Sequence, residues 1–200
     1  MREQIINKAC QLFLTAGFNC VTMDDLAREM AVSKKTIYKF YENKKQIVEQ
    51  VAFNAEKQLN DRILCVMDSG FNAVEEYFEI RKLFAEMIQV IGISQLYQLR
   101  KKYPDIYDYI KTSEHDIYNI FMIRNLSKGI KEGYFNDDIE VNDYIFFYQS
   151  IRFYITKDIV SRQKRNQLEF SAMIYHLNAL CTEKGRAELE RQLKLTNTII

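Results

Sequence analysis

A short cluster of lysines and hydroxyl-bearing residues is the part of this sequence best suited to binding an anionic partner. Five lysines against one acid, Glu42, give residues 34–45 a local charge of +4, whereas the whole chain carries only +1. Ammonium and hydroxyl groups donate hydrogen bonds to phosphate oxygens and to base edges. The segment therefore predicts nucleic-acid binding, with donors from Lys34, Lys35, Thr36, Tyr38, Lys39, Lys44 and Lys45.

Two short helices with marked starts would position these donors. Thr22 is followed three residues later by Asp25, which is the spacing of a capping box. After a joint at residues 31–33, Ser33 can cap a second helix that runs from Lys34 to about Phe40. This pattern predicts a helix-turn-helix whose second helix carries the cations.

The composition, and the small number of helix-breaking glycine and proline residues, favour an all-α protein of ordinary globular character. Charged residues make up 28% and hydrophobic residues 48% of the 200 residues. Six glycines and one proline predict long helices with short joints. No apolar run approaches the roughly 18 residues that span a bilayer, and residues 1–20 have the period of an amphipathic helix rather than an export signal. We therefore expect a cytoplasmic protein without membrane association.

Enzymatic and metal chemistry find little support in the sequence. It contains no nucleophile elbow, no phosphate-binding glycine loop and no HExxH pattern. The four cysteines form no CxxC pair and have no histidine nearby, which argues against zinc. We expect no catalytic residue, no metal and no cofactor.

The helical pattern predicts two domains joined by one long helix. Residues 1–46 would form a three-helix helix-turn-helix domain, and residues 47–200 a helical bundle, with about nine to ten helices in all. The helix that starts at Lys44 continues towards Cys65, so it would extend from the first core into the second. It is therefore the expected mechanical link between them.

The first fifty residues resemble the N-terminal domain of TetR-family transcriptional regulators. The matching positions are Ile5, Ala9, Cys10, Leu12, Phe13, Gly17, Phe18, Val21, Thr22, Met23, Leu26, Ala27, Val32, Ser33, Thr36, Ile37, Tyr38, Tyr41, Asn43 and Lys44. Two positions depart from the family pattern: Ala31 stands where glycine is usual, and Phe40 stands where tyrosine or histidine is usual. An alanine in the left-handed region would cost on the order of 1 kcal/mol relative to glycine.

The resemblance implies roles for these residues. Thr22 and Lys44 would hold the DNA backbone on either side of the groove, Tyr38 would donate to a phosphate, and the second helix would face the major groove. The expected DNA-binding set is Thr22, Ser33, Lys34, Lys35, Thr36, Tyr38, Lys39 and Lys44. No Arg, Asn or Gln lies between Ala31 and Glu42, so specificity would rest partly on DNA shape.

The resemblance also implies a dimer and a small-molecule effector. The expected dimer interface lies on the helices at about 141–160 and 167–181, with Tyr148, Ile151, Ile155, Phe170, Ile174 and Leu177. A pocket for a small apolar or aromatic ligand could be lined by Tyr77, Phe84, Met87, Tyr97, Tyr107, Phe121 and Phe147, although core packing is the alternative for each of them.

Two functions remain open at this point. The first is a dimeric transcriptional regulator, expected to be a repressor that its ligand releases from a pseudo-palindromic operator in double-stranded DNA. The alternative is a helical homodimer that binds a small molecule or a protein partner and whose DNA-binding head has degraded, as the changes at Ala31 and Phe40 would allow.

Overall fold

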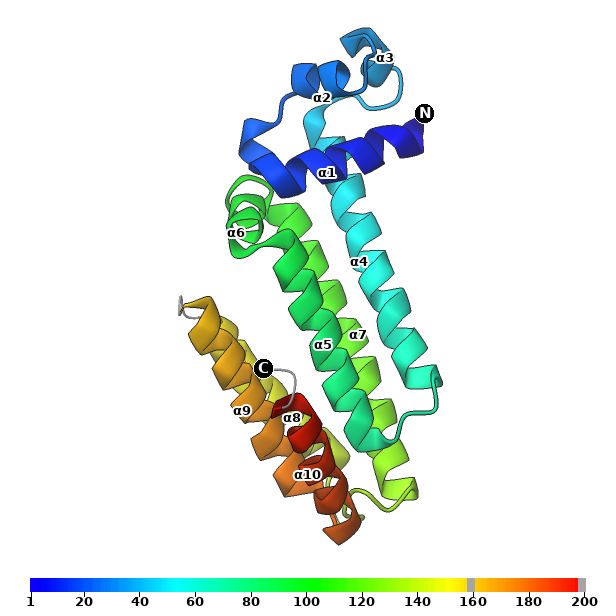
Figure 1. Cartoon of the computed structure of the whole chain (residues 1–200), viewed down its shortest axis with the longest axis vertical. Coiled ribbons are helices and arrows are strands. Elements are labelled where there is room, and N and C mark those ends of the chain that lie inside the picture. The colour runs from blue at the N-terminus through cyan, green and yellow to red at the C-terminus, as the bar shows by residue number, and fades with distance from the viewer. Residues whose placement is uncertain (158–160, 198–200) are drawn as a thin grey trace. The chain divides into compact units, whose positions relative to one another are not determined.

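The computed structural model describes residues 1–157 and 161–197, and in that part of the chain every regular element is a helix (Figure 1). An isolated antiparallel bridge pairs Phe135 with Cys181. The prediction of an all-α chain with a helix-turn-helix and a long fourth helix is confirmed. The helices are α1 (Arg2–Cys20), α2 (Met23–Glu29), α3 (Lys34–Tyr38), α4 (Lys44–Asp68), α5 (Ala73–Ile91), α6 (Ile93–Lys102), α7 (Pro104–Lys131), α8 (Val141–Lys157), α9 (Arg162–Leu180) and α10 (Glu183–Asn197).

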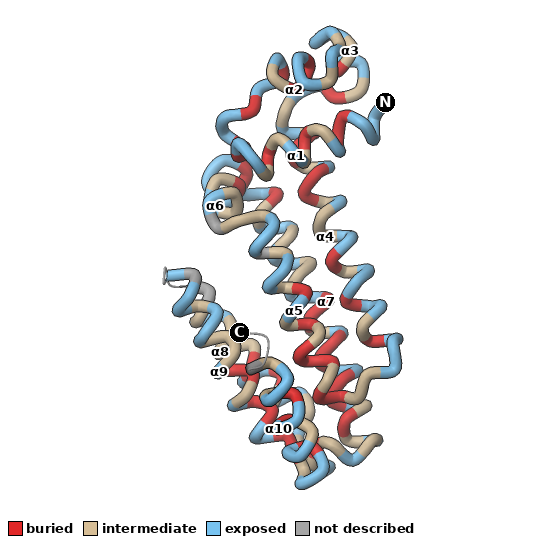
Figure 2. The backbone as a smooth tube through the Cα atoms, in the orientation of Figure 1, coloured by how far each residue is buried: buried red, intermediate tan, exposed pale blue. Residues whose placement is uncertain are grey.

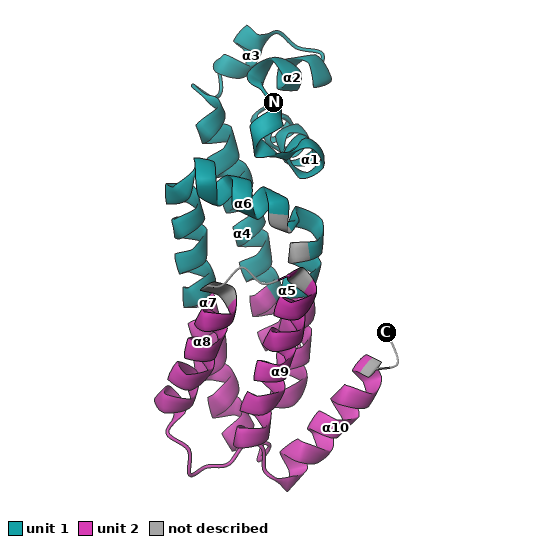
Figure 3. Cartoon of the chain, turned by 90° about the vertical axis from the view of Figure 1, so that its left-hand side faces the viewer, with its two compact units in different colours: residues 1–62, 84–116 teal, residues 63–83, 117–200 magenta. Residues whose placement is uncertain are grey.

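The chain forms two compact units, which Figure 3 distinguishes by colour. Unit 1 comprises Met1–Arg62 and Phe84–Asp116, and unit 2 comprises Ile63–Leu83 and Ile117–Ile200. Helices α4, α5 and α7 each contribute residues to both units. This division by contacts differs from the predicted boundary between residues 46 and 47, which stays a prediction about function.

The core of unit 1 is built by α1 to α4 and completed by residues of α6, of the start of α7 and of the joint between them. Its buried residues from the first fifty positions include Ile5, Phe13, Leu26, Ile37 and Ile47, and the same cluster contains the following three residues from later in the chain: Leu99, Tyr103 and Ile106. All three of these later residues are at most 7% exposed. The helix-turn-helix therefore shares its core with residues that lie far beyond it in sequence.

Helix α6 also contacts the end of α1 through two glutamines. Gln95 Nε2 donates to the Leu14 carbonyl oxygen at 3.0 Å, and the backbone N–H of Asn19 donates to Gln98 Oε1 at 3.0 Å. Gly17 has φ +83°, and a Cβ there would lie 2.7 Å from Gln98 Oε1. The positive φ favours glycine at this position, and a Cβ there would also displace the end of the Gln98 side chain from its hydrogen bond with Asn19.

Buried positions of unit 2 are red in Figure 2. They include an aromatic core with a small polar network inside it. The Tyr77 hydroxyl lies 3.0 Å from His176 Nε2, and the His176 ring stacks on Tyr148 with centroids 4.4 Å apart. Burial lowers the pKa of His176 to about 3, so the ring is neutral at pH 7. A second buried group, the Glu76 carboxylate, is balanced by Lys128 Nζ at 2.6 Å.

Candidate nucleic-acid interface

The start of α2 is fixed by the capping box that the sequence predicts. The Asp25 N–H donates to Thr22 Oγ1 at 3.1 Å, and the Thr22 N–H donates to Asp25 Oδ2 at 2.9 Å. Hydrogen bonds from Thr22 and from Arg28 lower the pKa of the Asp25 carboxyl. The reciprocal bonds satisfy two backbone N–H groups that the helix itself leaves unpaired.

The joint between α2 and α3 is tight and holds a strained residue. Ala31 has φ +53°, and it is the one non-glycine residue with positive φ in the described part of the chain. The next N–H, from Val32, donates to the Ala27 carbonyl oxygen at 3.0 Å. The left-handed conformation expected if Ala31 replaced a glycine is present, so the strain that accompanies it is also present.

Ser33 caps α3 in the predicted manner. Ser33 Oγ accepts from the Thr36 N–H at 3.1 Å and lies 2.8 Å from Thr36 Oγ1. Both hydroxyl groups are thus engaged within α3, and Thr36 is half-buried. These two predicted binding residues lie together, and they also shape the helix that carries them.

The outward side of α3 carries two unpaired ammonium groups. Lys35 and Lys39 are exposed and form no ion pair within residues 1–157 and 161–197. Tyr38, between them in sequence, is 43% exposed. This short helix therefore presents two free cations and a phenol to solvent, a combination that suits a phosphate-lined groove.

The other three lysines of the cluster have partners within unit 1. Lys34 Nζ lies 2.9 Å from Asp24 Oδ2, and Lys45 Nζ lies 2.5 Å from Asp105 Oδ2. Lys44 donates to the Phe18 carbonyl oxygen, and desolvation lowers the pKa of its half-buried ammonium. The predicted backbone-gripping Lys44 is therefore directed inward in this structure.

One acidic residue near the cations was not predicted to take part in the site. Asp24 lies in the first turn of α2, and its carboxylate accepts a hydrogen bond from Lys34, the first residue of α3. The separation of ten residues between Asp24 and Lys34 carries no local signal, because it depends on how α2 and α3 cross.

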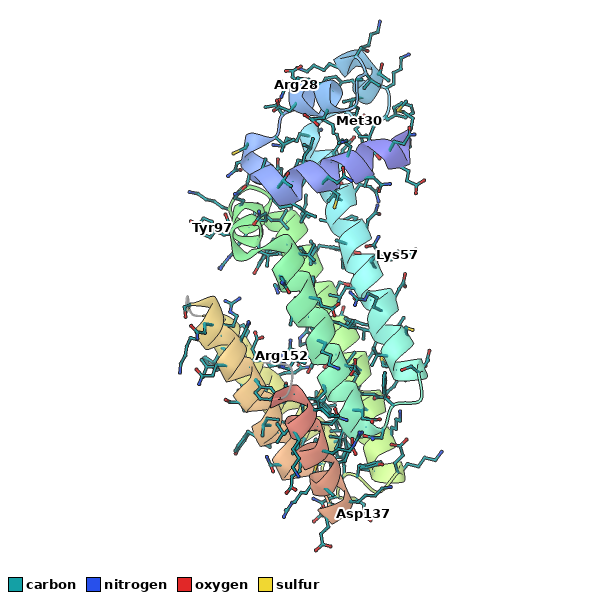
Figure 4. All side chains as sticks on the ribbon, in the orientation of Figure 1. Arg28, Met30, Lys57, Tyr97, Asp137 and Arg152 are labelled. Carbon is teal, nitrogen blue, oxygen red and sulfur yellow. The ribbon has the colours of Figure 1, made fainter. Side chains whose placement is uncertain are left out.

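The predicted ligand-pocket residues are divided between the two units. Four of them, Phe84, Met87, Tyr97 and Tyr107, belong to unit 1, and three, Tyr77, Phe121 and Phe147, belong to unit 2. Tyr97 is 60% exposed on α6 (Figure 4), and Phe147 is 57% exposed on α8. Tyr77 and Phe121 are buried against each other with ring centroids 5.2 Å apart.

A pocket of about 330 Å³ does occur in unit 2, at a different set of residues. Its lining is Met67, Glu76, Ile123, Arg124, Ser127 and Lys128. None of the seven predicted pocket residues is among these six, so the predicted lining remains a prediction.

The predicted interface residues on α8 and α9 divide into two groups. Tyr148 and Leu177 are 4% and 0% exposed within the single chain, so they leave almost no surface for a second copy to cover. The remaining four, Ile151, Ile155, Phe170 and Ile174, are half-buried. More exposed are four aromatic residues that the predicted interface omits: Phe146, Phe153, Tyr154 and Tyr175, which are 59–70% exposed. The seven-residue spacing of Phe146 and Phe153 was a sequence signal that these two rings share one helix face.

In the part of the chain that the structure describes, no helix combines the length and apolar character that crossing a membrane requires.

Comparison with known proteins gives a family for the N-terminal domain. A family model for bacterial regulatory proteins of the tetR family matches residues 5–51. The biofilm operon icaADBC HTH-type negative transcriptional regulator IcaR of Staphylococcus aureus (strain Newman) is 27% identical over 79 residues, which are 40% of this chain and 42% of IcaR. The HTH-type transcriptional regulator YvaF of Bacillus subtilis (strain 168) is 29% identical over 107 residues, 52% of this chain and 55% of YvaF. The chain thus matches about half the length of these curated relatives.

The solved structures extend the likeness in fold to nearly the whole chain. A transcriptional regulator from Cytophaga hutchinsonii ATCC 33406 is 16% identical, covers 90% of this chain and 98% of its own, and superposes with a TM-score of 0.71. At this identity the likeness concerns the fold alone. The capped helix-turn-helix and the matched residues 5–51 show that the N-terminal part of the chain is a helix-turn-helix domain of the kind found in the tetR family of bacterial regulatory proteins.

Proposed function

We propose that this protein is a dimeric DNA-binding regulator of transcription that acts as a repressor. The observation that carries the proposal is the pair of exposed, unpaired cations, Lys35 and Lys39, on the second helix of a family-matched helix-turn-helix. Repression is supported by the relative IcaR, which is described as a negative transcriptional regulator.

In the proposed complex, α3 enters the major groove. Lys35 and Lys39 lie near base edges or phosphates, and Tyr38 donates its hydroxyl to a phosphate oxygen. Lys44 reaches the backbone only after its ammonium leaves the Phe18 carbonyl. Lysine can bond guanine, but few of these side chains recognise a base bidentately, and no Arg, Asn or Gln lies between Ala31 and Glu42. Sequence-dependent DNA shape therefore supplies part of the specificity.

The proposed dimer uses α8 and α9. The exposed aromatic rings of Phe146, Phe153, Tyr154 and Tyr175 would lose their contact with water against a second copy, which is favourable for such large apolar surfaces. Two-fold symmetry would place the two recognition helices about 34–36 Å apart, so the operator would be a pseudo-palindrome.

The proposed effector is a small apolar or aromatic molecule bound by the domain at residues 47–200. Helix α4 starts at Lys44, beside the predicted DNA-binding residues, and runs without interruption to Asp68. A ligand that prefers the form with lower DNA affinity by about 1–3 kcal/mol would release the operator.

Selection of bound duplexes from a random library at near-physiological salt tests the proposal. The expected result is an enriched palindrome with half-sites about one helical turn apart. A matched selection with the Lys35→Ala, Lys39→Ala double variant should show no enrichment. If the folded, dimeric wild type enriches no sequence, the protein is not a regulator of this kind, and a helical dimer that binds a partner other than DNA becomes the better description.

A further inference from the structure

The proposed DNA-binding surface contains an acid whose presence needs a physical reason. Asp24 lies in the first turn of α2, and its Oδ2 is 2.9 Å from the Nζ of Lys34, the first residue of α3. A carboxylate on a surface that faces a polyanion repels phosphate and cancels one lysine. Its neighbour Asp25 has a structural task in the capping box, but Asp24 takes no part in that box.

Stability does not supply the reason. The side chains of Asp24 and Lys34 are 68% and 46% exposed, and ion pairs this exposed contribute little to folding. The helix starts are already secured by Thr22 and Ser33. What the pair does accomplish is to hold one ammonium of the lysine cluster at a fixed position across the helix-turn-helix.

We infer that Asp24 is a selectivity residue of the proposed DNA-binding surface, because it keeps the Lys34 ammonium from phosphates of non-cognate DNA. The inference rests on the proposed function. Binding to arbitrary sequences comes almost entirely from cations that neutralise phosphates, whereas contacts of α3 with base edges depend on sequence. In a loosely seated complex a free Lys34 would find a phosphate on any duplex, and Asp24 competes with that phosphate.

Cognate binding is affected less by the same pair. When base contacts fix the position of α3, Lys34 remains within reach of Asp24 and the ion pair persists. Asp24 therefore lowers affinity for random DNA more than affinity for the operator. Of the three lysines in α3 and its C-cap, Lys34 is therefore held in an ion pair by Asp24. Lys35 and Lys39 form no ion pair in the described residues.

The test compares Asp24→Asn, Lys34→Gln and the double variant in the full chain. Fluorescence anisotropy would measure the affinity for the selected operator and for a scrambled duplex of the same length and composition, at about 50–200 mM salt. Glu29→Gln is the matched control, since Glu29 is an exposed acid on the same helix that forms no ion pair in the described residues.

We expect Asp24→Asn to tighten binding to the scrambled duplex about fivefold, which corresponds to the interaction energy of one close charge pair in water. The slope of log affinity against log salt should become steeper by about one unit, the contribution of one phosphate contact. Operator binding should tighten less than twofold. In the Lys34→Gln background, Asp24→Asn should no longer change the salt dependence, because the ammonium that it frees is absent.

Three results would overturn the inference. Equal tightening on both duplexes by Asp24→Asn and by Glu29→Gln would mean that only net charge matters. An undiminished effect of Asp24→Asn in the Lys34→Gln background would mean that Asp24 acts without Lys34. A wild-type protein that binds DNA but does not distinguish the two duplexes would instead refute the proposed function, and the inference with it.

Discussion

Replacing Ala31 by glycine should stabilise the DNA-binding unit. Ala31 has φ +53° and is exposed, and its N–H donates to the Arg28 carbonyl oxygen at 3.1 Å, a bond that glycine keeps. The left-handed conformation costs an L-residue roughly 1–2 kcal/mol. Glycine gives back about 0.4–1 kcal/mol through the greater freedom of its unfolded chain. The net gain in the free energy of unfolding should be about 0.5–1 kcal/mol.

Urea unfolding followed by circular dichroism measures this gain as a higher midpoint at unchanged slope. The control is Ala85→Gly, an exposed alanine within α5, also in unit 1. There the same substitution should lower the free energy of unfolding by about 1 kcal/mol, because the helix conformation does not favour glycine. If Ala31→Gly destabilised the protein as Ala85→Gly does, the left-handed turn described above would be refuted.

Further perturbations bear on binding, on pH dependence and on assembly. The Lys35→Ala, Lys39→Ala double variant should weaken operator binding and flatten the slope of log affinity against log salt by about two units, as measured by anisotropy; an unchanged slope would remove both lysines from the interface. His176 has a pKa of about 3 when folded and 6.5 when unfolded, so the unfolded state binds the extra proton and stability is lost as pH falls from about 6.5 towards 3. His176→Phe should reduce that loss by up to about 1.4 kcal/mol per pH unit, and curves that stay parallel to wild type would contradict a buried neutral ring. Phe146→Glu with Tyr175→Glu should yield a folded monomer in analytical ultracentrifugation, whereas an intact dimer would place the interface elsewhere.

The sequence predicts the parts of the site that depend on local spacing. The Thr22–Asp25 capping box and the Ser33 cap involve residues three positions apart, so the pattern alone determines their partners. The partners of Lys34 and Lys44 are ten and twenty-six positions away. Those contacts depend on how α2 crosses α3 and on how α4 passes the end of α1, which a single sequence does not specify.

A similar limit applies to the aromatic residues of α8. The predicted interface includes Tyr148, which the structure buries beside His176, and it omits Phe146, which is 67% exposed. Both are large apolar side chains on one helix, and hydrophobic character does not distinguish them. The difference arises from which face of α8 meets α5, α7 and α9, a property of tertiary packing.

The shared core of unit 1 has a consequence for protein engineering. Residues 5–51 are the segment that sequence comparison recognises, yet Leu99, Tyr103 and Ile106 belong to the same buried cluster. A chimaera that transplants only the recognised segment would leave the places of these three side chains open to water. The helix-turn-helix domain of this protein therefore cannot be transferred on its own. A chimaera that exchanges this domain between regulators has to include α6 and the start of α7.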